Sequence, residues 1–436
     1  MSTFSPPALV NNVKHINKYA VLDLIRFSAG GISRVDIARQ LGLTRAAVTT
    51  IVNDLLHANV IREAESIYRP AGRPPTVLEI NPSTGYVLGI DVGATHLHIL
   101  LTDMAARICE EQETEFDIRV GPQAGIAEID RQVHLLLQKA GISLESILAI
   151  GIGVPGPIVA DAGAVFMPPI MPGWNDYPIR DTLQQLWGCP VSVNNDAELG
   201  VLGEWAFGAG RGERNLAYIK VGTGIGAGLM VEGKIYRGVT GSAGEIGHLT
   251  IEEDGPLCAC GNHGCLEAIA GGRAIALQAQ EAVQKNQRTI LSAIQPVESI
   301  TAREVAQAAR QGDLLAQKIL ARAGTHIGIA IAGLVNLLNP SLVIIGGGVA
   351  QTGDILLEPI RQAVQRRSLP AAVRAVRITT AMLGRRSSGL GAVIQALTIA
   401  LHRMVDSKEI KVSQQARFQN AEISLDLQAK VGSLER

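Results

Sequence analysis

The sequence predicts a mixed α/β fold in two parts, a small helical head and a larger body made of two α/β halves. Three observations predict this fold. The first 80 residues contain three short helical patterns followed by two extended runs. From about residue 83, apolar strands repeatedly end in glycine-rich loops and alternate with helices, as in doubly wound folds. The 436-residue chain is 47% hydrophobic and 18% charged, a composition that supports a large buried core.

The head is expected to contain three helices. The first covers about residues 16–27, and the second begins after the N-cap Ser33 and stops at Gly42. The third begins after Thr44 and extends to about Ala58. One side of this third helix is apolar at helical spacing: Val48, Ile51, Val52, Leu55 and Leu56. Its other side presents short polar and basic side chains: Arg45, Thr49, Thr50 and Asn53.

A short helix, a glycine turn and a polar-faced helix are together typical of a helix-turn-helix. Two extended runs between residues 60 and 80 then predict a wing or linker around 69–75, whose basic Gly72-Arg73-Pro74 suits a narrow minor groove. Residues 1–80 also hold nine Lys or Arg against six Asp or Glu. The alternative is a helical cap or dimerisation domain. We expect operator DNA to be contacted by five residues: Arg45, Thr49, Thr50, Asn53 and Arg73.

In the body, strands are expected at 87–90, 98–101, 147–154, 191–193, 217–221 and 342–345, with helices at 326–338 and 389–402 among those between them. Several of these strands run directly into glycine-rich loops, and backbone N–H groups in such loops can bind phosphate. Asp91, at a strand end, can hold Mg²⁺ through water. Taken singly, each loop is equally explained as a tight turn. The candidate nucleotide-binding residues are Asp91, Gly93, Thr95, Gly222, Thr223, Gly224, Gly226, Gly346 and Gly347.

Residues 244–267 concentrate three cysteines and a histidine in one short segment. Three thiolates and an imidazole form a tetrahedral zinc set with no open position, so a structural zinc ion is expected on four residues: His248, Cys258, Cys260 and Cys265. Disulfides or buried thiols are the alternatives. Cys109 and Cys189 stand alone and are expected in the core. Two carboxylates flank the cluster, Glu245 and Glu267, and these can hold sugar hydroxyls.

Polar residues interrupt the first thirty positions, so no secretory signal is expected: Lys14, His15, Lys18 and Asp23. No run of about 18 uncharged apolar residues occurs, so no membrane span is expected. These observations point to a cytoplasmic protein.

Four features of the sequence carry a resemblance to a known family: the Asp-x-Gly-x-Thr loop, the Asn-Asn-Asp segment, the Gly-Thr-Gly-x-Gly loop and the cysteine cluster. In these features the chain resembles the ROK family of bacterial sugar kinases and sugar-responsive repressors. The resemblance covers about residues 12–402. Its helix-turn-helix places it in the repressor branch, and the body then resembles the actin-like ATPase sugar-kinase fold. The resemblance implies zinc on the four residues named above and sugar contacts at Asn195, Asp196, Glu245, His248 and Glu267.

The chain departs from the kinases of that family at two loops. Ala94 stands where the kinases usually carry a second glycine, and its Cβ would crowd a phosphate. The Pro172-Gly173-Trp174 loop lacks the asparagine that often precedes it in the kinases. In a kinase Asp196 would be the base that takes a hydroxyl proton, whereas in a sensor it only accepts a hydrogen bond.

We therefore expect four parts along the chain. A winged helix-turn-helix with its linker covers residues 1–82, and a first α/β lobe covers 83–195 and is completed by about 386–404. A second lobe with the zinc knuckle covers 196–385, and a loosely held tail covers 405–436. The expected function is a sugar-responsive repressor that a monosaccharide or derivative releases from its operator, acting as a homodimer or homotetramer. Two alternatives stay open. One is an ATP- and Mg²⁺-dependent sugar kinase that retains a DNA-binding head, and the other is a regulator whose signal is a protein partner.

Overall fold

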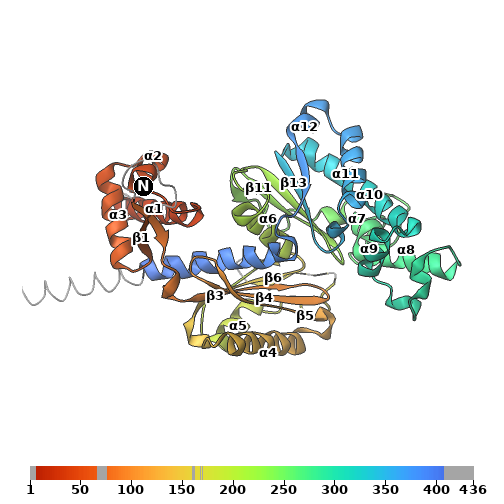
Figure 1. Ribbon diagram of the computed structural model, residues 1–436, viewed down its shortest axis with the longest axis horizontal. Coiled ribbons are helices and arrows are strands. Elements are labelled where there is room, and N and C mark those ends of the chain that lie inside the picture. The colour runs from red at the N-terminus through yellow and green to blue at the C-terminus, as the bar shows by residue number, and fades with distance from the viewer. Residues whose placement is uncertain (1–5, 66–75, 160–162, 167, 169, 407–436) are drawn as a thin grey trace, which may run out of the picture. The chain divides into compact units, whose positions relative to one another are not determined.

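The computed structural model describes residues 6–65, 76–159, 163–166, 168 and 170–406 (Figure 1). Within these residues the chain forms two compact units. The first contains the residues up to Tyr86, the short segment Asp103–Arg107 and the residues from Leu397 onward. The second contains Val87–Thr102 and Ile108–Ala396.

The first unit contains the three expected helices followed by an antiparallel hairpin: α1 (Pro6–Phe27), α2 (Arg34–Leu41), α3 (Arg45–His57), β1 (Ile61–Glu65) and β2 (Thr76–Ile80). Helix α1 begins ten residues earlier than predicted, at two prolines whose fixed φ suits a first helical turn. Both predicted N-caps are confirmed, because Ser33 accepts the backbone N–H of Asp36 and Thr44 accepts that of Ala47. These caps fix where α2 and α3 begin.

The last described helix, over 387–406, contributes its final turns to the first unit. The Tyr19 hydroxyl of α1 donates to Asp406 at 2.6 Å, and the Tyr19 ring stacks on His402 with centroids 4.0 Å apart. Arg26 donates to the Thr398 hydroxyl at 2.8 Å. Within the first unit, the end of this helix is therefore packed against α1.

The second unit contains two five-stranded sheets. The first sheet has the order β5 (Ile108–Glu115), β4 (His96–Asp103), β3 (Tyr86–Val92), β6 (Ile147–Val154) and β9 (Val191–Asn195). Helices α4 (Pro122–Ala140) and α5 (Ile179–Trp187) cover one face of this sheet (Figure 1). A small hairpin of β7 (Ile158–Val159) and β8 (Ala164–Val165) follows β6.

The other face of the first sheet receives the start of the 387–406 helix at very close range. A Cβ on Gly89 would lie 2.3 Å from the Gly389 carbonyl oxygen, and one on Gly151 would lie 2.0 Å from the Ala392 carbonyl oxygen. Only glycine permits this approach of helix backbone to strand backbone. The two glycines thus fix the depth at which the helix lies on the sheet.

The second sheet has the order β12 (Lys234–Ile235), β11 (Ile225–Val231), β10 (Leu216–Val221), β13 (Leu342–Gly346) and β14 (Arg377–Thr380). Helix α6 (Asp196–Phe207) packs on one face, around the buried Tyr218. The larger core lies on the other face, beneath α7 (Leu266–Ala270), α8 (Gly272–Gln284), α9 (Ala302–Arg310), α10 (Leu314–Leu338) and α11 (Asp354–Arg367). The short α12 (Pro370–Ala375) leads into β14.

Two long apolar helices and two isolated cysteines bear on expectations from the sequence, and only the expectation about the cysteines needs correction. The segments Leu314–Leu338 and Gly384–Asp406 are long and apolar enough to cross a membrane by length and composition, but more than half of each apolar window is buried inside the protein. Packing in the core accounts for that composition. Cys109 is exposed and Cys189 is half-buried, so neither lies in the core. Cys109 lies on β5, an edge strand, which leaves part of its surface open.

The close approach at Gly151 predicts a stability effect. Gly151→Ala should lower the free energy of unfolding by about 1–3 kcal/mol, because the new Cβ must displace the Ala392 backbone. Gly333→Ala is the matched control, since no atom lies within 4 Å of the place that a Cβ would take at this position in α10, and alanine favours a helix. Urea denaturation of both variants measures the difference. Equal stabilities would contradict this account of the helix–sheet contact.

Candidate functional site

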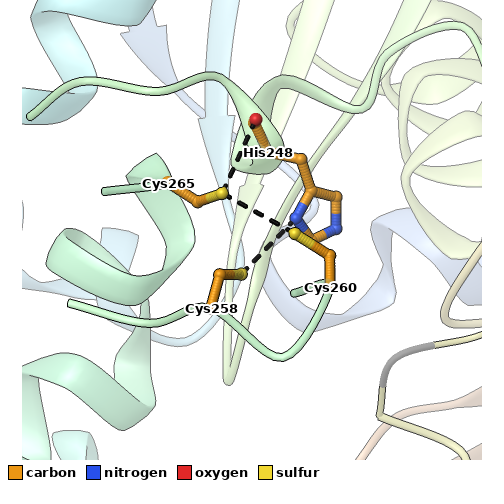
Figure 2. Close-up of side chains that lie close together, drawn as sticks. All are labelled: His248, Cys258, Cys260 and Cys265. Carbon is orange, nitrogen blue, oxygen red and sulfur yellow. Dashed lines mark hydrogen bonds between the residues drawn. The ribbon is translucent and has the colours of Figure 1, made fainter. Parts of the chain in front are cut away.

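The four residues of the predicted metal cluster lie together in the structure (Figure 2). A short 3-10 turn, Ile246–His248, carries the histidine, and Cys265 is the residue before α7. The Cys258 Sγ lies 3.7 Å from the His248 Nδ1, and the Cys260 and Cys265 sulfurs lie 3.7 Å apart. All four ligand atoms lie within 4.8 Å of one another. The segment therefore brings one nitrogen and three sulfurs to a single point.

These separations fit a tetrahedral ion. With zinc–sulfur bonds of about 2.3 Å, the corners of a tetrahedron lie roughly 3.8 Å apart. Glycine makes the necessary turn possible at Gly264, where φ is +65° and a Cβ would lie 1.5 Å from the Glu252 carbonyl oxygen. Burial and the neighbouring thiols raise the pKa of Cys265 to about 12, so a cation is needed to hold it as a thiolate near neutral pH.

The His/Cys cluster adjoins a group of carboxylates. The second ring nitrogen of His248, Nε2, lies 3.9 Å from the Glu245 carboxylate. Glu267, two residues after Cys265, accepts the Ile225 backbone N–H at 2.9 Å. The histidine thus turns one nitrogen toward the thiols and the other toward the acidic group.

The carboxylates interact electrostatically across this site. Burial raises the pKa of Glu245 to about 7, and the nearby Asp196, Glu267 and Glu198 contribute to this by their negative charge. Glu198 is itself buried, and it pairs with Arg237 at 3.1 Å. Two of the predicted sugar contacts, Asp196 and Glu267, therefore act electrostatically on a third, Glu245.

Asn195 has a different part in the structure. Its Oδ1 accepts the backbone N–H groups of Ala197 and Glu198 and so caps α6, while its Nδ2 donates to the Gly156 carbonyl. These bonds hold the first turn of α6 against the Pro155–Pro157 loop. In this arrangement the Asn195 side chain positions Asp196, the first residue of the helix.

Lys220 was not among the sequence-predicted site residues, yet its ammonium lies between the two buried aspartates. Its Nζ lies 2.9 Å from Asp196 and 3.3 Å from Asp91, and it donates to the Ser388 hydroxyl at 3.3 Å. The available signal was a lone lysine in the otherwise apolar strand β10, directly before the Gly222 loop. Such a lysine must find a carboxylate partner when it is buried.

The Lys220 ammonium faces the carboxylates of Asp91 and Asp196, and the pKa values of these two carboxylates shift in opposite directions. Burial would raise the pKa of Asp91, but Lys220 and the nearby His96 outweigh burial and lower it. Burial raises the pKa of Asp196, and the adjacent Asp91 adds to this against the opposing effect of Lys220. Burial would lower the pKa of Lys220, but both aspartates outweigh it and raise that pKa. The lysine therefore stays charged.

At most of the predicted phosphate-loop glycines, a side chain would come too close to another part of the protein. A Cβ added to Gly93 would lie 2.1 Å from the His96 ring. At Gly224 it would lie 2.1 Å from the Glu267 carboxylate, and at Gly346 it would lie 2.1 Å from the Tyr218 hydroxyl. At Gly347 it would lie 2.3 Å from the Val221 carbonyl oxygen. The two other candidate glycines differ, because a Cβ at Gly222 would meet open space and one at Gly226 would make only an ordinary contact. Packing thus explains four of these glycines without a phosphate.

The predicted DNA-contacting face of α3 is exposed. Its four residues lie on the outer side of the helix: Arg45, Thr49, Thr50 and Asn53. Arg34, Arg39 and Arg62 form ion pairs with neighbouring acids, whereas no ion pair involves Arg45 within the described part of the chain. Arg73, the predicted minor-groove residue, lies outside the described residues. The head therefore offers one basic and three small polar side chains on its third helix.

Comparison with known proteins gives three consistent results. The sequence model of the ROK family matches residues 87–399. A xylose repressor of Caldicellulosiruptor bescii is 32% identical over 386 residues, which cover 88% of this chain and 96% of that protein. The crystal structure of a ROK family transcriptional regulator, a homologue of the Escherichia coli Mlc protein, superposes with a TM-score of 0.75 at 29% identity, covering 90% of this chain and 99% of the other.

A glucokinase of Halalkalibacterium halodurans is similar over a smaller share of the chain. It is 35% identical over 311 residues, which cover 71% of this chain and 94% of that enzyme. The family match begins at residue 87, and the main segment of the first unit ends at Tyr86. The similarities that cover 88% and 90% of the chain are therefore to a repressor and to a transcriptional regulator.

Proposed function

The chain belongs to the ROK family, and we propose that it is a sugar-responsive transcriptional repressor. It binds an operator through its helix-turn-helix, and a monosaccharide or a derivative of one lowers its affinity for that operator. One observation carries this proposal: the same chain has an exposed polar face on α3 and several carboxylates near His248 of the His/Cys cluster. A homodimer or homotetramer would present two heads to the two halves of a pseudo-palindromic operator.

The sugar site is the group of acidic residues beside His248. Sugar hydroxyls donate hydrogen bonds, and carboxylates are the strongest acceptors that a protein offers them. Glu245 lies 3.9 Å from the histidine, and Asp196 and Glu267 act on Glu245 electrostatically. Asn195 supports the site by capping the helix that begins at Asp196.

We propose that His248, Cys258, Cys260 and Cys265 hold one structural zinc ion per chain. The support is the donor set together with spacings that fit tetrahedral zinc. Zinc bound at Nδ1 would fix the ring and its tautomer, so that Nε2 stays directed at the sugar site. The ion and the sugar would then share one histidine.

Cys260→Ser should therefore remove the zinc and also weaken sugar binding by about tenfold, because His248 loses its anchor. Cys109→Ser is the matched control, since Cys109 is exposed and lies outside the cluster. Elemental analysis and calorimetric sugar titration measure the two effects. If the Cys260→Ser protein keeps its full zinc content, these four residues are not the zinc site.

At a pH above the raised pKa of Glu245, which is about 7, Glu245→Gln should weaken sugar binding by about tenfold or more, since a charge-assisted hydrogen bond is replaced by a neutral one. The exposed Glu253→Gln serves as the control for the same chemical change. Titration with a panel of pentoses and hexoses gives the affinities, and operator binding with and without sugar gives the response. By linkage, operator DNA must weaken sugar binding by the same factor as sugar weakens DNA binding. A Glu245→Gln protein that responds like the parent would show that the pocket lies elsewhere.

For the head, Arg45→Ala should reduce operator affinity by about 1–3 kcal/mol if Arg45 reads a base, and leave sugar binding unchanged. Arg131→Ala is the control, because Arg131 lies on α4 in the second unit and pairs with Glu128. Arg73→Ala tests the minor-groove contact in the same assay. Fluorescence anisotropy with operator DNA at fixed salt measures all three variants. Unchanged affinity in both Arg45→Ala and Arg73→Ala would rule out this mode of docking.

A further inference from the structure

We propose that Lys220 is a built-in cation that replaces a divalent metal ion between Asp91 and Asp196, so that this chain can bind a sugar without being able to phosphorylate it. The proposal goes beyond sugar sensing itself, since operator and sugar binding can both occur whether or not it holds. It concerns Lys220 and Asp91, which the proposed repressor function leaves unexplained, and their contacts with Asp196 of the proposed sugar site.

The geometry around the ammonium is complete. An ammonium has three N–H donors, and three acceptor groups surround Nζ: Asp196 at 2.9 Å, Asp91 at 3.3 Å and the Ser388 hydroxyl at 3.3 Å. The Lys220 side chain is only 14% exposed, while those of Asp91 and Asp196 are 3% and 13% exposed. All three donors of the lysine can thus be satisfied by the protein.

This arrangement argues against a phosphate-binding role for the lysine. A lysine that binds a phosphate must offer it at least one N–H donor, and here each donor already has an acceptor within the protein. His96 also lies 3.5 Å from the same Asp91 carboxylate, with its ring packed against Gly93. Two basic side chains therefore face Asp91, the residue whose position suits a metal ion.

Charge balance explains why a cation is needed at this point. Two buried carboxylates that face each other repel, and removing one partner from a buried ion pair leaves an uncompensated charge. In this chain Lys220 compensates the charge of the two carboxylates. Without Lys220, a divalent ion from solution would have to occupy the position of its ammonium. Phosphoryl transfer requires such ions to neutralise the developing charge, and it requires an aspartate free to accept the hydroxyl proton. With Lys220 in place, neither requirement is met.

The test is Mn²⁺ binding, because Mn²⁺ prefers oxygen ligands and gives a direct spectroscopic signal. Electron paramagnetic resonance is used to titrate Mn²⁺ into the zinc-loaded parent, Asp91→Asn, Lys220→Met and Lys220→Met/Asp91→Asn. The exposed Lys285→Met is the matched control. We expect Lys220→Met to bind Mn²⁺ at least about tenfold more tightly than the parent, and the added Asp91→Asn change to abolish that gain. A loss of packing alone would produce no such metal site.

Thermal unfolding with and without Mn²⁺ gives the second readout. Lys220→Met should melt at a lower temperature than the parent and recover in Mn²⁺, whereas the parent and Lys285→Met should not respond. If Lys220→Met does not fold in metal-free buffer, refolding yield with and without Mn²⁺ replaces the melting curve. The proposal is overturned if Mn²⁺ binds the parent in an Asp91-dependent way, or if Lys220→Met shows no Mn²⁺-dependent gain in binding, melting temperature or refolding. Either outcome leaves the repressor assignment to be judged by the DNA and sugar measurements.

Discussion

Buried negative charge is the constraint on which the second unit depends. Asp91 and Asp196 are both deeply placed, and Glu245 is close enough to Asp196 and Glu267 for their charge, together with burial, to raise its pKa to about 7. A protein can hold such a group only if cations and hydrogen-bond donors surround it. Lys220 supplies the cation on one side. On the other, Glu245 lies 3.9 Å from the histidine of the His/Cys cluster. Lys220, Asp91, Asp196 and Glu245 are therefore electrostatically coupled.

Close backbone approach is the second requirement, and glycine supplies it. Gly224 leaves room for the Glu267 carboxylate, and Gly264 permits the turn inside the cysteine segment. Gly151 lets the 387–406 helix lie against β6, and Ser388 at the start of that helix reaches Lys220. The glycine-rich loops thus hold the acidic site in shape through contacts within the protein. Contacts within the protein account for four of the six candidate phosphate-loop glycines without a phosphate ligand.

The same fold is found in relatives of two kinds, so function must be argued from particular side chains. The head and its α3 face separate this chain from the glucokinase, whose similarity covers 71% of the chain against 88% for the xylose repressor. Within the shared part, the proposed inability to phosphorylate a sugar rests on the position of Lys220 between Asp91 and Asp196. One basic side chain at the end of a strand can alter the chemistry of a site while leaving its architecture intact.

The sequence by itself determined the features that depend on neighbouring residues. Caps at Ser33 and Thr44, the apolar stripe of α3 and the spacing of the three cysteines are local patterns, and the structure confirms the elements that they predict. Only the tertiary structure decided what distant segments do together. It set Lys220 between Asp91 and Ser388, which are 129 residues before and 168 residues after it, and it gave Asn195 its partner at Gly156. It also placed the end of the 387–406 helix against α1. Such contacts leave no periodic signal, because charge pairing across the fold depends on where strands and helices end in space.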